Sequence, residues 1–156
     1  MPAPRYWLMK SEADCYSIDH LAKDKKTFWD GVRNYQARNY MRDDMKVGDL
    51  VLFHHSNADP PGVAGIAKVV KLAYPDHTAL DPKEKHFDPK STKENPIWMM
   101  VDLAFVEKFP HFCGLDELKK RKDLDGLVLL QRGSRLSIQP VEKKHFDIIC
   151  RLGRGK

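Results

Sequence analysis

The pattern of apolar and polar positions predicts several short strands spread along the chain. Residues 6–9 and 50–55 are apolar on both faces of an extended segment, which is typical of buried strands. Further strands are predicted over residues 63–73, 97–108 and 135–139. Gly65 falls inside one of them, where a glycine indicates a bulge or a close approach of another part of the chain.

Helical periodicity predicts two helices in the first third of the chain. Ser17 precedes Ile18 and Leu21, and this spacing after a hydroxyl residue indicates a short capped helix. Asn34 is placed to cap a second helix that ends near Met45. The apolar stripe of this second helix, at every fourth residue, consists of Ala37, Met41 and Met45. We expect that stripe to face the core.

Two more helices are predicted toward the end of the chain, one over residues 115–122 and one that begins at Pro140 and ends at Gly153. The face expected to be buried on the last helix consists of Val141, His145, Ile148 and Leu152. Residues 74–96 are charged, broken by prolines and without periodicity, and a connection of that length is usually functional or mobile. Strands flanked by short helices predict an α+β fold with a small, strongly bent sheet or barrel.

Composition limits the class of protein. With 156 residues, of which 42% are hydrophobic, the chain can bury one core, so we expect one globular domain over residues 1–156. No run is apolar and long enough for a membrane helix, and the first residues lack the apolar core of a signal peptide. An intracellular protein without membrane contact is therefore expected. Three widely spaced cysteines indicate neither a disulfide framework nor a Cys-x-x-Cys metal site.

Positive charge is concentrated at the end of the sequence. Residues 119–156 hold 11 Lys or Arg against 4 acids, whereas the rest of the chain is almost balanced. The densest cluster is Lys119-Lys120-Arg121-Lys122. Such a cluster is most often a solvated helix face, and contact with nucleic-acid phosphates is the alternative interpretation.

Residues 29–39 carry the most informative side chains for function. Trp29 and Tyr35 offer aromatic faces, Asn34 pairs a donor with an acceptor, and Arg33 can bind phosphate or stack on a ring. This set suits a flat polar ring such as a nucleobase. The simpler interpretation is a loop that enters a helix, with both aromatic side chains in the core.

The sequence offers few groups for catalysis. His54 and His55 are adjacent on a predicted strand, so they point to opposite faces and cannot chelate one metal ion together. Ser134 lacks the Gly-x-Ser-x-Gly context of an activated nucleophile. Lys10-Ser11-Glu12 is the one triplet that has the side chains for base or nucleophile chemistry, although a lysine at a strand end is ordinarily a surface or phosphate-binding residue.

Six motifs, in the same order and across nearly the whole chain, resemble the EVE domain of the thymocyte nuclear protein family. They are Trp7-Leu8-Met9-Lys10-Ser11-Glu12, residues 29–39, His55-Ser56, residues 62–65, Tyr74-Pro75-Asp76 and residues 134–140. The run Gly-Val-Arg-Asn-Tyr-Gln-Ala-Arg-Asn is the most specific of them. Two positions depart from the family's pattern, because Ala13 stands where proline is common and His54 stands where tyrosine is common.

The resemblance implies a PUA-like fold, a curved sheet or pseudobarrel with flanking short helices, similar to YTH domains that recognise methylated bases. It also implies a nucleic-acid-binding module that accepts a methylated or hydroxymethylated cytosine in an aromatic and polar pocket beside a basic surface. The pocket residues it implies are Trp29, Gly31, Val32, Asn34, Tyr35, His55, Ser56, Ser134, Leu136 and Ser137. The implied contacts to phosphate or sugar are Lys10, Ser11, Arg33, Arg38 and Arg135.

The expected partner is DNA or RNA with modified bases, bound by a monomer that is not an enzyme and needs no cofactor or metal. The expected compartment is the cytoplasm of a bacterium or the nucleus of a eukaryote. The alternative is a hydrolase of modified nucleosides, because ASCH-type domains are PUA-like, resemble this chain in size, and place a lysine and an acid near the pocket. Lys10 and Glu12 share one face of a strand and fit those roles. A third possibility is a protein-interaction domain, which an exposed apolar patch without a pocket would favour.

Overall fold

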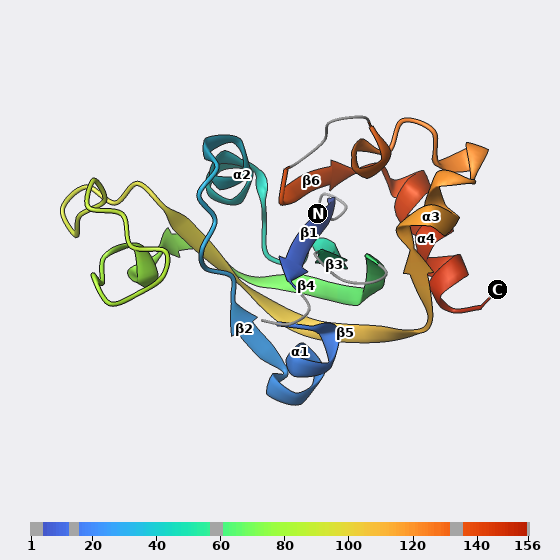
Figure 1. The fold of residues 1–156 in the computed structure, drawn as a ribbon, viewed down its shortest axis with the longest axis horizontal. Coiled ribbons are helices and arrows are strands. Elements are labelled where there is room, and N and C mark those ends of the chain that lie inside the picture. The colour runs from blue at the N-terminus through green and yellow to red at the C-terminus, as the bar shows by residue number, and fades with distance from the viewer. Residues whose placement is uncertain (1–4, 13–15, 57–60, 132–135, 156) are drawn as a thin grey trace.

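The computed structural model describes residues 5–12, 16–56, 61–131 and 136–155, which form a six-stranded sheet with short helices around it (Figure 1). The strands are β1 (Tyr6–Glu12), β2 (Lys26–Phe28), β3 (Leu50–Ser56), β4 (Gly62–Pro75), β5 (Met99–Gly114) and β6 (Ile138–Val141). Their order across the sheet is β2-β5-β4-β3-β1-β6; β1 and β3 are parallel, and the other neighbours are antiparallel. The predicted α+β class is confirmed, although the sequence pattern does not predict β2.

The sheet is bent because its two longest strands, β4 and β5, pair with several shifts of register. One shift lies between Val63 and Gly65. A Cβ atom at Gly65 would stand 2.3 Å from the backbone oxygen of Glu107, so only glycine fits there. The predicted bulge or close approach at Gly65 is therefore confirmed.

Two of the described helices begin where the sequence predicts a cap. The helices are α1 (Ile18–Asp24), α2 (Tyr35–Asn39), α3 (Leu115–Lys119) and α4 (Lys143–Gly153), and α2 continues as a π-helical turn (Tyr40–Asp44). The side chain of Ser17 accepts a hydrogen bond from the backbone three residues later, and Asn34 Oδ1 accepts one from the Ala37 N–H at 3.0 Å. Ala37, Met41 and Met45 are all buried, which confirms the predicted stripe.

Alternating side chains of the central strands divide the core between the two faces of the sheet. Trp7 and Met9 of β1 belong to the cluster that also contains side chains of α1 and α2. Leu8, between them, belongs to the cluster that contains side chains of α3 and α4. The first pair of helices thus covers one face of the sheet and the second pair covers the other.

The end of the chain differs from the prediction. Pro140 does not begin the last helix, because it lies in β6 opposite Trp7. β6 is an edge strand with a neighbour on one side only, so proline can be accommodated there although it has no N–H to donate. The helix begins three residues later, and its buried residues are His145, Phe146, Ile149, Cys150 and Gly153. Ile148 and Leu152 of the predicted face are only half-buried.

Two further boundaries move by a few residues. The helix predicted over residues 115–122 ends at Lys119 and is followed by a short 3-10 turn, Lys122–Leu124. The strand predicted over residues 135–139 is β6, Ile138–Val141, in the described part of the chain. No described helix has the length and apolar character needed to cross a membrane.

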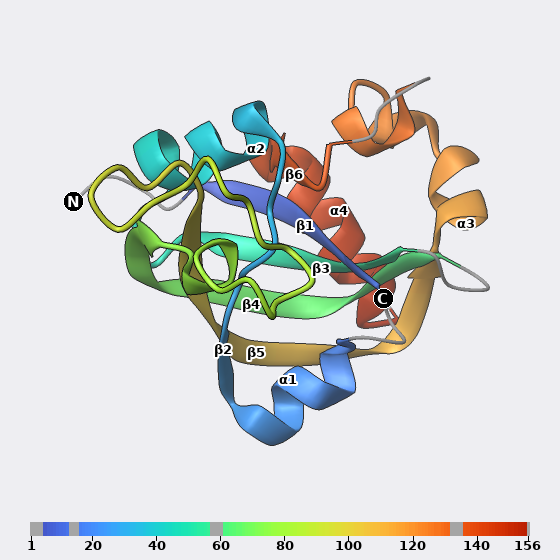
Figure 2. The same ribbon diagram turned by 60° about the vertical axis from the view of Figure 1, so that its left-hand side comes forward.

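The long connection between β4 and β5 stands at the end of the sheet away from α3 and α4. Both ribbon views place residues 76–98, drawn in yellow-green, beside the segment that leads from β2 into α2 (Figures 1 and 2). This connection contains the 3-10 turn His77–Ala79. Its position brings residues far apart in sequence to one end of the molecule.

Candidate functional site

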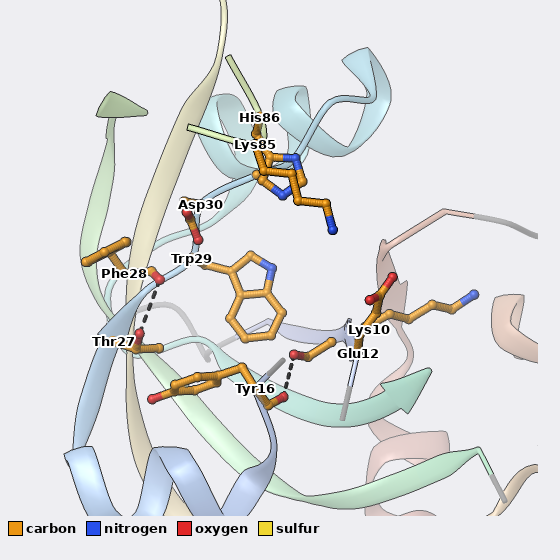
Figure 3. A pocket seen from close by; sticks show the side chains of 11 residues that line it. Lys10, Glu12, Tyr16, Thr27, Phe28, Trp29, Asp30, Lys85 and His86 are labelled. Carbon is orange, nitrogen blue, oxygen red and sulfur yellow. Dashed lines mark hydrogen bonds between the residues drawn. The ribbon is translucent and has the colours of Figure 1, made fainter. Parts of the chain in front are cut away.

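A hollow of about 500 Å³ opens beside Trp29, on the face of the sheet that α1 and α2 cover. It lies between the end of β1, the segment before α1, β2 and the β4–β5 connection (Figure 3). Its lining consists of Lys10, Ser11, Glu12, Tyr16, Thr27, Phe28, Trp29, Asp30, Gly31, Lys85 and His86. Aromatic rings, carboxylates and cations therefore meet around one cavity.

Trp29 forms a fixed aromatic wall of this hollow. Its backbone N–H donates to the Val101 oxygen at 2.7 Å, and its indole meets the Phe53 ring edge to face at 5.5 Å. The indole Nε1 donates to no described residue, and Figure 3 shows it turned toward the side of the hollow where Lys85 lies. The wall thus presents one positioned donor with no acceptor in the described protein.

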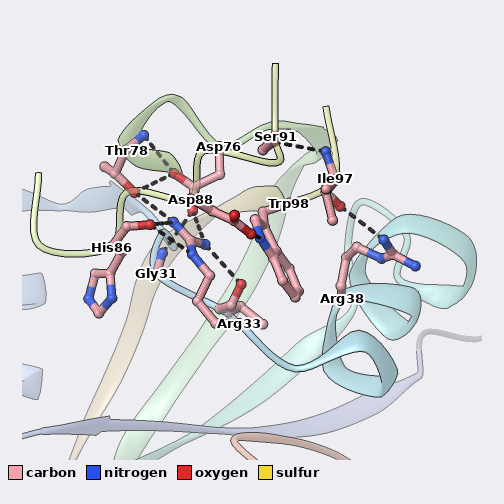
Figure 4. A network of polar contacts seen from close by, with 11 residues as sticks. Gly31, Arg33, Arg38, Asp76, Thr78, His86, Asp88, Ser91, Ile97 and Trp98 are labelled. Carbon is pink, nitrogen blue, oxygen red and sulfur yellow. Dashed lines mark hydrogen bonds and ion pairs between the residues drawn. The ribbon is translucent and has the colours of Figure 1, made fainter. Parts of the chain in front are cut away.

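Gly31 allows the β4–β5 connection to close over the hollow. Its φ is +78°, and a Cβ there would lie 2.8 Å from the His86 ring, so a larger residue would displace the imidazole. The Gly31 N–H donates to Asp76 Oδ2 at 2.8 Å. Arg33 donates to the same carboxylate at 3.0 Å and to the backbone oxygen of His86 at 2.6 Å. These contacts hold His86 beside Gly31 (Figure 4).

Asp76 anchors this arrangement from a buried position. Burial by itself raises the pKa of the Asp76 carboxyl, but hydrogen bonds from Thr78, Gly31 and Arg33 outweigh that effect and hold the pKa below its usual value. A buried carboxylate is stable when several donors and a cation satisfy it, as here. The ionised Asp76 therefore joins the segment before α2 to the connection that carries His86.

The end of β1 supplies the opposite rim. Ser11 Oγ donates to the backbone oxygen of Tyr16 at 2.6 Å, which holds the Tyr16 backbone at the edge of the hollow. Lys10 donates its backbone N–H to the Ser137 oxygen at 2.8 Å, and Figure 3 shows its side chain extended away from the indole of Trp29. Partial burial lowers the pKa of the Lys10 amine. Glu12 is exposed.

His54 and His55 point to opposite faces of β3, as the alternation along a strand predicts. His55 Nε2 accepts the backbone N–H of Ile18 at 3.1 Å, and its ring lies between the rings of Phe53 and Phe112. His54 is buried and its ring nitrogens make no hydrogen bond to a described residue. Neither ring lines the hollow, and the described residues contain no group of three or more metal-binding side chains.

Four of the residues expected at the site line the hollow together: Lys10, Ser11, Trp29 and Gly31. Those described outside its lining are Val32, Arg33, Asn34, Tyr35, Arg38, His55, Ser56, Leu136 and Ser137. Ser134 and Arg135 lie outside the described residues. Val32 is in the core, Asn34 caps α2, and Ser56 ends β3 opposite Glu12.

Both expected arginines before and within α2 have their nitrogens engaged by the protein. Arg33 donates to Asp76, Thr78 and the backbone of Val32 and His86. Arg38 donates to the Ile97 oxygen at 3.0 Å and to Asn39 Oδ1.

Sequence reasoning does not identify Tyr16, Thr27, Phe28, Asp30, Lys85 and His86 as site residues. The unusual length of the β4–β5 connection is the one sequence signal that points to Lys85 and His86.

The basic run at residues 119–122 borders a different hollow, of about 540 Å³. The floor of this second hollow includes Leu124 and Leu127, which belong to the core on the α3 and α4 face. The two hollows are therefore on opposite faces of the sheet. Arg121 pairs with Asp123 at 2.6 Å.

Comparison with known sequences shows relatives along nearly the whole chain. A family model described as EVE domain matches residues 5–152. Human thymocyte nuclear protein 1 is 44% identical over 166 residues, which cover 94% of this chain and 73% of that protein. The chicken (Gallus gallus) thymocyte nuclear protein 1 is 43% identical, covering 97% of this chain and 69% of that protein.

Solved structures with the same fold also cover nearly the whole chain. A Pseudomonas syringae protein is 49% identical with a TM-score of 0.92, over 95% of this chain and 99% of that chain. Human thymocyte nuclear protein 1 in complex with DNA containing 5-methylcytosine is 42% identical with a TM-score of 0.91, over 97% and 99%. A YTH domain from Zygosaccharomyces rouxii shares the fold alone, at 12% identity and a TM-score of 0.59. The predicted PUA-like fold is confirmed, and the chain belongs to the EVE domain family.

Proposed function

We propose that this EVE domain binds nucleic acid and takes one modified base, a methylated or hydroxymethylated cytosine, into the hollow beside Trp29. The observation that carries the proposal is the aromatic-walled hollow of about 500 Å³ in a chain whose human relative was crystallised with DNA containing 5-methylcytosine. This volume lies within the range of about 300–1,000 Å³ that is common for small-molecule sites. The same relative favours DNA over RNA as the partner.

The side chains around the hollow match the hydrogen-bonding groups of cytosine. Cytosine donates through its exocyclic amine and accepts through its ring nitrogen and carbonyl oxygen. Asp30 and Glu12 supply acceptors for the amine, and the indole N–H of Trp29 and the amine of Lys85 supply donors. The apolar 5-methyl group would lie against one of the aromatic rings that line the hollow.

The other expected residues receive supporting roles in this proposal. Asn34 fixes the start of α2, and Arg33 and Arg38 hold the β4–β5 connection with nitrogens that are already engaged. The remaining expected residues lie outside the lining, and we assign them no direct contact with the base; they are Val32 in the core, and His55, Ser56, Leu136 and Ser137. Lys10 and Ser11 remain candidates for the sugar and phosphate, and so do Ser134 and Arg135, outside the described residues.

We infer recognition without catalysis. Of the two residues suited to a hydrolase, Lys10 extends its amine away from Trp29, and Glu12 is exposed at the rim. A general base has to lie within hydrogen-bond reach of the proton that it removes. The human relative, with its bound DNA, likewise supports a binding role. We further propose that the chain works as one domain and as a monomer, in the nucleus of a eukaryote or the cytoplasm of a bacterium.

Calorimetric titration with 5-methyl-2′-deoxycytidine and with 2′-deoxycytidine tests the proposal. We expect tighter binding of the methylated nucleoside, and Trp29→Ala should weaken it by roughly 1–3 kcal/mol, the loss typical of one stacked base. Phe112→Ala is the matched control, because that ring packs against the same core without lining the hollow. Unchanged binding in Trp29→Ala, or no preference for the methylated nucleoside, would refute the base pocket.

A further inference from the structure

Tyr35 is a large aromatic side chain that is both exposed and held in place. It is the first residue of α2, and 58% of its surface is exposed. Its ring lies 4.9 Å from the ring of Trp98 at an angle of 31°, and the guanidinium carbon of Arg38 lies 4.9 Å from the Tyr35 ring centre. The ring of Tyr35 therefore packs against Trp98 and Arg38 and is also exposed to solvent.

The groups behind Tyr35 are themselves fixed by hydrogen bonds. Trp98 is buried and its Nε1 donates to Asp88 Oδ2 at 2.6 Å. Arg38 donates to the Ile97 oxygen at 3.0 Å. Figure 4 shows the Trp98 indole between two guanidinium groups, with the Arg33 carbon 5.5 Å and the Arg38 carbon 6.0 Å from its ring. Such contacts between cations and aromatic faces are attractive.

We call this set the stacking row; it consists of Arg33, Trp98, Arg38 and Tyr35. One end of the row is connected to the hollow, because Arg33 donates to the backbone oxygen of His86, which lines the hollow. The other end is the exposed ring of Tyr35. The stacking row therefore runs from His86, at the edge of the hollow, to the exposed ring of Tyr35.

The chemistry of the row fits a polynucleotide next to the hollow. Every nucleobase has a π-face, so an aromatic platform accepts the neighbouring base without sequence preference. Arg33 is paired with the ionised Asp76, whereas Arg38 donates only to neutral oxygens, so the charge of Arg38 favours an anionic chain. Because Trp98 and Arg38 already fix the tyrosine ring, stacking a base on it loses little side-chain entropy.

We propose that Tyr35 is a second stacking site, which takes the base adjacent to the modified cytosine. This inference rests on the proposed function, since it places the neighbour of a base bound in the hollow. It gives Tyr35 a role outside the hollow, and it makes Trp98 and Arg38 positioning residues for that platform. The recognised unit is then at least a dinucleotide.

The experiment compares 5-methyl-2′-deoxycytidine with single-stranded dinucleotides that carry 2-aminopurine on either side of 5-methylcytosine. Stacking quenches 2-aminopurine fluorescence, so we expect quenching on one of the two sides. The dinucleotide should bind about tenfold more tightly than the nucleoside, within the range that one stacked base supplies. Tyr35→Ala should abolish both the quenching and the tenfold gain, and Tyr35→Phe should retain them, because the ring rather than the hydroxyl stacks.

The outcomes separate this inference from the base pocket. Tyr35→Ala should leave binding of the free methylated nucleoside unchanged. If that variant loses the nucleoside as well, Tyr35 belongs to the base site and the second stacking site is refuted. If wild-type protein binds the nucleoside but gains nothing from the dinucleotide, the second site is refuted while the pocket stands. If no nucleoside binds but 2-aminopurine is quenched through Tyr35, the base pocket is refuted, and with it the role of Tyr35 as the site for the adjacent base, while stacking on Tyr35 itself is supported.

Discussion

The buried imidazole of His54 should make the stability of this protein depend on pH. His54 is only 3% exposed, and both of its ring nitrogens lack a hydrogen-bond partner among the described residues. Burial, reinforced by the nearby charge of Lys10, lowers the pKa of His54 to about 4. The folded protein therefore keeps this ring neutral at pH values where the unfolded chain protonates it.

The sign and size of the effect follow from proton linkage. A histidine whose folded pKa is depressed contributes full stability above its unfolded pKa of about 6.5, and that contribution falls as the pH drops toward the folded pKa. The difference between about 6.5 and a folded value of about 4 corresponds to about 3 kcal/mol of unfolding free energy, lost between those two pH values. Below pH 4 the contribution of His54 is constant.

Urea unfolding followed by tryptophan fluorescence, from pH 7.5 to 4.5, measures this loss in wild type and in His54→Phe. Phenylalanine has a ring of similar shape, does not titrate, and leaves no buried polar atom without a partner. We expect His54→Phe to be at least as stable at pH 7.5 and to lose less of its stability on acidification.

The difference between the two proteins isolates His54, since Asp76 and the other carboxyl groups titrate in both. His77→Gln, at an exposed histidine, is the control and should follow the wild-type curve. Parallel curves for wild type and His54→Phe would refute the assignment of a buried, neutral imidazole.

Three further predictions concern the site. Gly31→Ala should lose about 1 kcal/mol of stability from backbone strain, and it should also weaken base binding in calorimetry because its Cβ displaces the His86 ring. Gly48→Ala is the control, because Gly48 has a φ of +97° but open space around it. This control should show the loss of stability without the loss of binding. Asn34→Ala should lower the unfolding free energy by about 1 kcal/mol through the lost helix cap, and Asn34→Asp should restore it in thermal denaturation. Mass spectrometry should recover 5-methyl-2′-deoxycytidine unchanged after incubation, and turnover that disappears in Lys10→Ala would contradict the binding role.

The elements that sequence predicts well are those fixed by local interactions. Ser17 and Asn34 cap helices within three residues, and the stripe of Ala37, Met41 and Met45 needs only the helical repeat. β2 escapes prediction because it is a three-residue edge strand whose residues are exposed or half-buried, so it shows no apolar alternation. Pro140 indicates a helix start by its local preference, but an edge strand tolerates it equally well.

The hollow is less predictable because its lining comes from four separate segments. Trp29 and Gly31 are identified from the sequence, and so are Lys10 and Ser11 of β1. His86 is held at the hollow in part by Arg33, 53 residues earlier, which donates to its backbone oxygen. No local pattern encodes a contact of that separation.

The specific run at residues 31–39 therefore has a different physical meaning from the one its side chains first indicate. Its arginines suit phosphate, yet in the folded chain Arg33 and Arg38 bind backbone oxygens of the β4–β5 connection and flank Trp98. Arg33 is neutralised by Asp76, so the charge that favours an anionic partner beside Tyr35 is that of Arg38, and it acts without contact to each phosphate. Substitution of either arginine should consequently change the geometry of base recognition, and substitution of Arg38 should also reduce the salt dependence of binding. A motif of this kind therefore indicates where on the protein the ligand binds, but it does not by itself identify the side chains that contact the ligand.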